Sequence, residues 1–461
     1  MTLLGLWHPA GASAGLTIGR PGAEGRPLDV AVIQAQRRTG LGAAVEQAAR
    51  RMAPDGIAWI VVGRTRRGSA ARAARRAGLV VVDRVLMVPP WPATAHLVAL
   101  APGALADAGV RHLGLSPRRA RLLASLCGAR TGRALLARGA RGCALVAARP
   151  GAPAPLSWLG AIDGGAVAGA TASAGPRRDA PVAVVLRFAR GSSSPDLAVK
   201  IALDADAVER VGAERAALVR LGPVAAAAGA AVPTPRPAQA AGVLAVDALP
   251  GRPASALLAG SAAQTDGVLR VVASWLLAWN RSTAVTCRAT PALLEQWLLG
   301  PAARVAAALP STARHAECMR QLAARLEGSA LVTVAAHNDL TMSNVLLDEG
   351  RLSIVDWEAA QADGLPLLDL WYALADGVAR GRRVGHARAV ELLVSAAPGP
   401  LRSLAELPAA HAAEQGISSD QALLAFHACW LRHADDELRR GTPGPFLAAA
   451  EAVATLELRR P

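Results

Sequence analysis

The chain has 461 residues, enough for about two to four domains, and it carries 50 Lys and Arg against 35 Asp and Glu, a net charge of +15. Its five cysteines form no C-x-x-C pair, and it has no signal-peptide pattern and no apolar run of membrane-spanning length, which argues against a zinc site, a disulfide framework and a membrane span. We therefore expect a reduced, cytoplasmic protein.

The basic residues are spread along the chain as pairs, such as Arg37-Arg38 and Arg66-Arg67, and aromatic residues make up only 3% of the sequence. A nucleic-acid-binding surface usually shows a denser basic tract. The composition thus favours a solvated, Arg-rich surface, and nucleic acid is an unlikely partner.

Strand and helix patterns alternate over the first hundred residues. Apolar runs predict strands, and amphipathic stretches between them predict helices. The strands are expected at 28–36, 56–63, 79–89 and 95–103, and the helices at 42–52 and 69–78. Residues 104–148 have a helical, Arg-rich pattern. The sequence therefore predicts an α/β domain over residues 1–148.

The order of these elements, with the "PDG" turn at 54–56, resembles the C-terminal half of class I methyltransferases over about residues 28–103. A glycine-rich strand–loop–helix for S-adenosylmethionine is not recognisable, because "GLWHPAGASAGLTIG" (5–19) has no long strand before it. The resemblance therefore implies a truncated, non-catalytic or docking domain in preference to an active methyltransferase.

The Pro/Gly/Ala-rich segment "ARPGAPAPLS" (148–157) is predicted to be a linker. Two strands, expected at 181–190 and 196–203, follow as a hairpin. The second contains Lys200, the only lysine in the chain. A chain that uses Arg at its other basic positions keeps a compact ammonium here, which suggests a site where a planar guanidinium does not substitute.

The next segment, 204–221, is predicted to be a helix that Asp204 caps. Glu214 falls on its apolar face, where a carboxylate needs a partner, and Lys200 is the obvious one. Glu209, on another face of the helix, is the alternative partner.

The most informative segment is 332–374, which contains H-x-D-x-x-x-x-N as His337, Asp339 and Asn344. A hairpin follows and ends at Asp356. Phosphoryl transfer needs an oriented hydroxyl and Mg²⁺ ions that neutralise the phosphate oxygens. Asp339 can accept the hydroxyl proton, Asn344 and Asp356 can bind the metal, and His337 is expected to organise the loop.

This pattern resembles the catalytic core of the aminoglycoside phosphotransferase / choline kinase-like family, which has the protein-kinase fold. Asp356, Trp357 and Glu358 stand in place of the kinase D-F-G. The resemblance implies ATP, Mg²⁺ and phosphorylation of a hydroxyl on a small molecule. It also implies a structural role for Asp369. Asn338 occupies a position where Gly is common, and Asn tolerates the unusual backbone angles required there.

The expected fold is thus an α/β N-terminal domain plus an α+β bilobal protein-kinase-like phosphotransferase domain, with an N-lobe at 158–250 and a helical C-lobe at 251–461. By the same resemblance, the nucleotide site includes Lys200, which contacts the phosphates, and Glu214, its carboxylate partner, while the backbone near Val246, Asp247 and Leu249 lies against the adenine.

Four points stay open in the sequence. The glycine-rich segment 160–178 is either the phosphate-covering loop or a loop rich in small residues through coding bias. Trp275, Trp279 and Trp297 are expected to be core residues in preference to a substrate platform. Arg380, Arg382 and Arg383 either recognise an anionic acceptor or are solvated.

The competing function is a non-catalytic module, either a pseudokinase or a scaffold of a biosynthetic complex. The oligomeric state is unknown.

Overall fold

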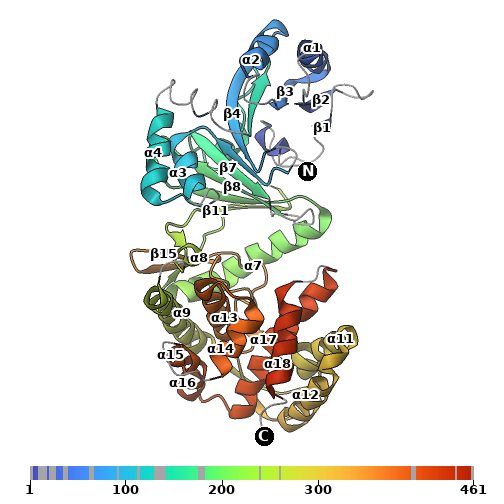
Figure 1. Cartoon of the computed structure of the whole chain (residues 1–461), viewed down its shortest axis with the longest axis vertical. Coiled ribbons are helices and arrows are strands. Elements are labelled where there is room, and N and C mark those ends of the chain that lie inside the picture. The colour runs from blue at the N-terminus through green and yellow to red at the C-terminus, as the bar shows by residue number, and fades with distance from the viewer. Residues whose placement is uncertain are drawn as a thin grey trace. The chain divides into compact units, whose positions relative to one another are not determined.

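The computed structural model describes residues 4–8, 18–19, 27–34, 40–61, 67–90, 93–111, 115–128, 136, 142–174, 182–237, 240–258, 261–395, 401–441 and 444–457. The chain forms two compact units (Figure 1). Unit 1 comprises Met1–Ala213 and Thr234–Ala248, and unit 2 comprises Glu214–Pro233 and Leu249–Pro461.

Unit 1 is built on a ten-stranded sheet with the order β1-β2-β3-β6-β4-β5-β7-β8-β9-β11. Strands β1 to β3 are parallel, and every later pair of neighbours is antiparallel. The strands are β1 (Ile18–Gly19), β2 (Leu28–Gln34), β3 (Met52–Val61), β4 (Val80–Val88), β5 (His96–Ala99), β6 (Cys143–Ala148), β7 (Gly169–Ala174), β8 (Val182–Phe188), β9 (Leu197–Ala202) and β11 (Val243–Asp247).

The helices of unit 1 cover this sheet in two groups. Helices α1 and α2 pack on the part made by β2, β3, β6 and β4, while α3 and α4 pack on each other, with α3 against β5 and β7 (Figure 1). The helices are η1 (Gly5–Trp7), α1 (Leu41–Arg51), α2 (Arg67–Arg76), α3 (Pro102–Arg111), α4 (Pro117–Gly128) and α6 (Ser157–Ala161); α7 (Ala205–Ala227) contributes to both units.

Alternation along the strands places one set of side chains on each face of the sheet. Ala31 and Ile33 of β2 pack with Val45 of α1 in one apolar core, whereas Val30 and Trp59 belong to the core on the other face. The strands and helices predicted between residues 28 and 103 are confirmed, with shifts at their ends.

Strand β6 corrects the prediction of helix across residues 104–148. It lies between β3 and β4 and is buried along its whole length. A short Ala-rich apolar run has no periodicity that separates a buried strand from a buried helix. The pairing with two neighbouring strands decides its conformation, and this pairing is not visible in the local sequence.

The segment predicted as a linker, 148–157, leads directly into the core of unit 1. Leu156 is buried, its backbone N–H donates to the carbonyl of Trp7 (3.2 Å), and the indole of Trp158 donates to the carbonyl of Leu6 (2.9 Å). Strand β5 pairs with β7, so the sheet continues through the expected boundary. The domain limits drawn from the sequence remain a proposal.

Arg187 joins three segments of unit 1. Its guanidinium donates to Asp163 (2.6 and 2.8 Å), to Asp196 (2.7 Å) and to the carbonyl of Leu159 (3.0 Å). The side chain is only 3% exposed, so these partners replace its hydration. The hydrogen bond from Arg187 lowers the pKa of Asp163 to about 2.

Unit 2 is mainly helical and has two small sheets, β10-β16-β15-β12 and β13-β14-β17. Its strands are β10 (Ala230–Ala231), β12 (Arg252–Pro253), β13 (Val285–Arg288), β14 (Ala330–Ala336), β15 (Val345–Asp348), β16 (Arg351–Ile354) and β17 (Gln361–Gly364). Its helices, besides part of α7, are α8 (Ala254–Leu257), α9 (Ala262–Thr283), α10 (Pro291–Leu294), the π-helical turn η3 (Glu295–Leu299), α11 (Gly300–Ala308), η4 (Pro310–Thr312), α12 (Ala313–Leu326), α13 (Leu368–Arg382), α14 (His386–Val394), α15 (Arg402–Ala405), α16 (Leu407–Glu414), α17 (Ser419–Arg439) and α18 (Pro445–Glu457).

The tryptophans of α9 and η3 are core residues, as the sequence predicts. Trp275, Trp279 and Trp297 are all buried. The indole of Trp279 donates to the carbonyl of Ala335 (2.6 Å), so it fixes α9 to the strand that leads into the candidate site.

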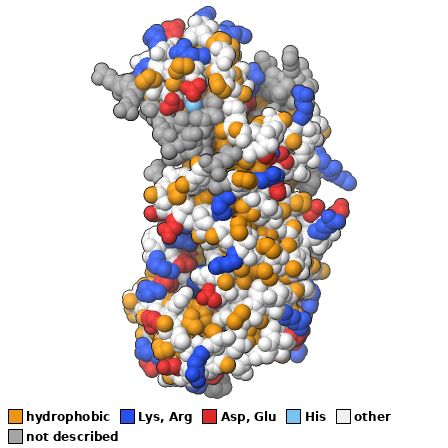
Figure 2. Space-filling view, turned by 180° about the vertical axis from the view of Figure 1, so that it is seen from behind, with side chains coloured by type: hydrophobic (Ala, Val, Ile, Leu, Met, Phe, Trp, Pro, Cys, Tyr) orange, Lys and Arg blue, Asp and Glu red, His pale blue; other side chains and the backbone are white. Residues whose placement is uncertain are grey.

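The basic side chains on the face of the molecule drawn in Figure 2 are dispersed among apolar and acidic ones and form no continuous tract. Among the described residues, no helix combines the length and apolarity needed to cross a bilayer.

Arg187→Gln should lower the free energy of unfolding of unit 1 by about 3 kcal/mol at pH 7, because it leaves two carboxylates without their cation. The stability that Asp163 gains from its lowered pKa is present above its unfolded value of 3.8 and is lost as the pH falls through about 2, so the deficit should shrink in acid. Hydrogen exchange of the β7 and β8 amides measures this. The exposed Arg190→Gln is the control, and equal exchange rates in both variants would contradict the prediction.

Candidate functional site

The candidate site lies in unit 2, on the loop 337–344 between β14 and β15. The backbone N–H groups of His337 and Asn338 donate to the two carboxylate oxygens of Asp369 (2.6 and 2.7 Å) at the start of α13. Farther along the loop, the N–H of Met342 donates to Asp376 (2.8 Å), also on α13. Helix α13 thus holds the loop at its start and again at Met342.

His337 is buried, and both ring nitrogens contact the site's own backbone. Nε2 lies 3.1 Å from the carbonyl of Val355, and Nδ1 accepts from the N–H of Asp339 at 3.4 Å. Because a carbonyl only accepts, the proton sits on Nε2. The ring also packs edge-on against Trp357, with centroids 5.0 Å apart. These contacts suit a residue that organises the loop.

Asn338 adopts φ = 65°, in the left-handed region, where Asn is tolerated better than most residues. Its amide NH₂ donates to the carbonyl of Ala359 (2.9 Å), and its oxygen accepts from Arg432 (2.6 Å). A Gly at this position would allow the same backbone conformation but would lose these side-chain hydrogen bonds and the one to Gln361 (3.3 Å).

Asp339 is the central carboxylate of the site. The Nδ2 of Asn344 donates to its backbone carbonyl (2.9 Å) and to its Oδ2 (3.2 Å). Burial raises the pKa of Asp339 to about 7, and repulsion from Asp356 and Glu358 adds to the shift, while hydrogen bonds from Tyr372 and Asn344 oppose it. The negative charges of Asp356 and Glu358 are therefore felt at Asp339.

Asp356 follows β16 at the point where the strand has ended, with φ = 70°. The next residue, Trp357, is fully buried; it lies edge-on to Trp279, and its backbone N–H donates to Oε1 of Glu214 (3.3 Å). The turn that carries Asp356 is thus fixed by a carboxylate from α7 and by aromatic packing.

Tyr372 is a site residue that the sequence analysis did not identify. It is the only tyrosine in the chain, and its hydroxyl forms a hydrogen bond with Asp339. The rings of His433 and Phe446 pack against it, with centroids 4.0 and 5.7 Å away. The rarity that singles out Lys200 would have singled out Tyr372 as well.

The predicted nucleotide residues lie in both units. Lys200 is in β9 of unit 1, opposite Val184 of β8 and Leu244 of β11. Glu214 is buried and Glu209 is exposed, which agrees with the apolar face inferred for α7, and the N–H of Ala207 donates to the predicted cap Asp204 (2.8 Å). The pairing of Lys200 with Glu214 remains a prediction.

Val246 and Asp247 end β11 in unit 1, and Leu249 begins the second part of unit 2. The carboxylate of Asp247 accepts from Nε of Arg236 (3.0 Å), so it is engaged within unit 1. Of the predicted phosphate loop, 160–178, residues 160–174 form the end of α6, a turn and β7; residues 175–178 lie outside the described residues, as does the rest of the β7–β8 connection.

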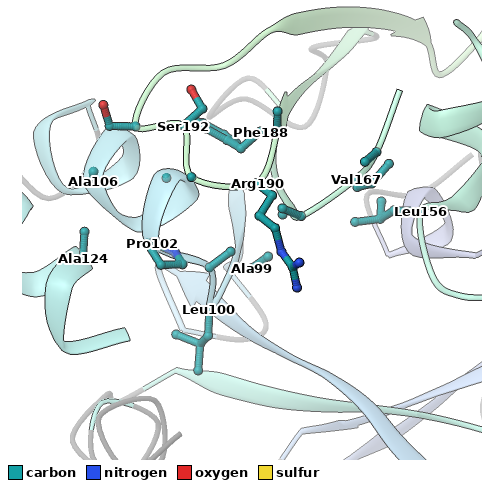
Figure 3. Close-up of a pocket in the computed structure, with 18 of the residues that line it drawn as sticks. Ala99, Leu100, Pro102, Ala106, Ala124, Leu156, Val167, Phe188, Arg190 and Ser192 are labelled. Carbon is teal, nitrogen blue, oxygen red and sulfur yellow. The ribbon is translucent and has the colours of Figure 1, made fainter. Parts of the chain in front are cut away.

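A pocket of about 940 Å³ lies in unit 1; residues 166–169 of the predicted phosphate loop line part of it, and none of the other predicted site residues does. Figure 3 shows Arg190 extending among apolar side chains that include Ala99, Leu100 and Val167. This pocket does not belong to the candidate site.

Of the three arginines near 380, Arg380 is paired with Asp376 (2.8 Å), whereas Arg382 and Arg383 are exposed.

The donor set around Asp339 suits a hard cation. Asp356 and Glu358 supply anionic oxygens, and Asn344, whose NH₂ is used by Asp339, offers its amide oxygen. The mutual repulsion that raises the pKa of Asp339 is the kind of electrostatic cost that a bound Mg²⁺ would relieve. These oxygen ligands are of the kind that Mg²⁺ prefers, and its binding here remains a prediction.

Residues 184–407 match the model of the phosphotransferase enzyme family. This match supports the kinase-like fold predicted for that part of the chain. A macrolide 2′-phosphotransferase from Brachybacterium faecium is 19% identical, with 61% of this chain and 89% of that chain covered and a TM-score of 0.33. A choline/ethanolamine kinase family protein from Mesorhizobium loti is also 19% identical, with 61% and 86% covered and a TM-score of 0.36. No curated protein matches the chain in sequence.

The match includes the whole loop and hairpin that carry the candidate residues, and it ends before α17 and α18. It begins within β8, so residues 28–103, with their expected likeness to methyltransferases, lie outside it. That likeness remains an expectation.

Asp339→Asn should stabilise the metal-free protein at pH 8 by roughly 2 kcal/mol and have little effect at pH 4. The pKa of Asp339 is about 7 in the folded state and 3.8 in the unfolded state. Between these values only the folded state is protonated, so the free energy of unfolding of the wild type falls as the pH rises toward 7. Thermal unfolding in chelator at both pH values measures the difference. The exposed Asp363→Asn should show no such gain, and an Asp339 variant that behaves the same way would refute the assignment.

Proposed function

We propose that this protein is an ATP- and Mg²⁺-dependent phosphotransferase that acts on a hydroxyl group of a small molecule. The observation that carries the proposal is the environment of Asp339: this carboxylate, on the loop after β14, is held by Asn344 and Tyr372 and repelled by Asp356 and Glu358. The match of residues 184–407 to the phosphotransferase enzyme family supports it.

In this proposal, Asp339 orients the acceptor hydroxyl and takes its proton, which its raised pKa suits at neutral pH. Tyr372 and Asn344 hold the carboxylate in place, and His337 keeps the loop in shape. Asn344 and Asp356 would hold Mg²⁺, which when bound neutralises charge on the transferred phosphoryl group.

Lys200 would contact the nucleotide phosphates, with Glu214 as its carboxylate partner. The backbone near Val246, Asp247 and Leu249 would contact the adenine. These assignments rest on the position of Lys200 as the single lysine, inside a strand that pairs on both sides, and on the burial of Glu214.

The decisive test is transfer of labelled γ-phosphate to a panel of hydroxyl-bearing small molecules. Asp339→Asn should lower kcat by about 10²- to 10⁴-fold, because a positioned general base contributes about that much. Asp356→Asn should lose both activity and Mg²⁺-dependent nucleotide binding, while Asp363→Asn, which alters an exposed acid of β17, should behave like the wild type.

Thermal stabilisation by ATP, with and without Mg²⁺, separates the remaining outcomes. Stabilisation without transfer or hydrolysis would favour the non-catalytic pseudokinase or scaffold. Wild-type activity in Asp339→Asn would contradict its role as the base, and the absence of any response to ATP would contradict the kinase function.

Tyr372→Phe should shift the acidic limb of the pH–rate profile to higher pH at a fixed Mg²⁺ concentration. Its hydroxyl lowers the pKa of Asp339, so its loss raises that pKa and leaves less of the unprotonated base near pH 6.5. Activity should therefore fall more at pH 6.5 than at pH 8.5, with the KM for ATP unchanged. Equal losses at both pH values would indicate a role in packing alone.

A further inference from the structure

Three side chains with metal-binding atoms meet in unit 1. His8 follows η1, Asp29 lies in β2, and Asp55 lies in β3. One ligand atom from each, a ring nitrogen or a carboxylate oxygen, lies within 4.8 Å of the other two. This spacing allows a single ion to contact all three.

The backbone is shaped locally to bring the two carboxylates together. Leu28 pairs with Met52 and Val30 with Ile57, so Asp29 alone on β2 faces residues 53–56 on β3. This bulge is the "PDG" segment of the sequence, and it projects a residue out of the regular ladder.

Gly56 makes the bulge possible. A Cβ at this position would lie 2.8 Å from the carbonyl oxygen of Leu28, so any larger residue would push β2 and β3 apart. The close approach holds Asp55 beside Asp29 on the neighbouring strand.

The N-terminal segment that carries His8 is fixed by three indole hydrogen bonds. Trp59 donates to the carbonyl of Leu4 (3.2 Å), Trp158 donates to the carbonyl of Leu6 (2.9 Å), and Trp7 donates to Asp83 (3.0 Å). His8 itself is buried, and its ring hydrogen-bonds to the backbone of Asp55. A hydrogen bond of this kind typically orients a metal-binding imidazole.

The local composition adds a second argument. The first 82 residues contain only four acidic side chains, Glu24, Asp29, Glu46 and Asp55, and two of them meet His8. The chain has a net charge of +15, and acidic residues are rare in this part of it. The pairing of two carboxylates here is therefore not explained by a high local content of Asp and Glu.

We infer that His8, Asp29 and Asp55 form a binding site for a first-row divalent transition ion, with zinc as the representative. One imidazole with two carboxylates favours such ions over Mg²⁺ and Ca²⁺, which prefer oxygen ligands alone. Asp29 and Asp55 both reach solvent, so water can complete the coordination. The bound ion would tie the N-terminal segment to β2 and β3.

This inference does not rest on the proposed function. Its three residues lie in unit 1, whereas Asp339, Asn344 and Asp356 lie in unit 2. A zinc site could exist without phosphotransferase activity, and activity could exist without the zinc site.

The test uses the untagged full-length protein, stripped with chelator and dialysed against Zn²⁺ in excess Mg²⁺, which occupies sites that prefer oxygen ligands. Zinc is then measured by elemental analysis and by titration, and Co²⁺ is added separately for its visible absorption. Wild type and Glu46→Gln should bind zinc alike, since Glu46 is an exposed acid of α1 outside the cluster. His8→Gln, Asp29→Asn and Asp55→Asn should each bind about tenfold more weakly or worse.

Asp55→Asn is the decisive variant, because its side chain reaches solvent and its replacement should leave the fold intact. Zinc should raise the thermal unfolding temperature of the wild type and of Glu46→Gln but not that of Asp55→Asn. Wild-type zinc affinity in both Asp29→Asn and Asp55→Asn would overturn the inference. So would a wild type that binds no zinc under these conditions, since the cluster would then be held by hydrogen bonds and charge alone.

Discussion

The geometry of the candidate site depends on the carboxylate of Asp369, which accepts two consecutive backbone N–H groups of the loop. A loop that leaves a buried strand has polar backbone groups that water cannot reach, and each must find a partner. Asp369 supplies both partners at once. It thereby determines where the next residue, Asp339, projects.

Helix α13 contributes more than this one residue. Asp369, Tyr372 and Asp376 are separated by three and four positions, so they lie on one face of the helix. The first and last hold the loop backbone, and the middle one forms a hydrogen bond with Asp339. A single helical face therefore sets the shape of the loop and also adjusts the acidity of its central carboxylate.

Much of this site could be predicted from the sequence, because its residue types are demanding and its spacing is local. Asp339, Asn344 and Asp356 are brought into one region by a single loop and hairpin, as their pattern indicates. Tyr372 and the bond from Trp357 to Glu214 could not be read from spacing, since both depend on how α13 and α7 pack. Strand β6 was missed for a related reason: its conformation is decided by neighbours that are more than 50 residues away in sequence.

The pairing of β5 with β7 has a consequence for the kinase-like part of the chain. Without residues 96–99, β7 would be the outermost strand beside β8, with one row of N–H and C=O groups unpaired. Such an exposed edge can recruit a strand from another molecule and lead to aggregation. Strand β5 thus covers the edge of β7, and residues 158–461 expressed alone would become prone to self-association through β7.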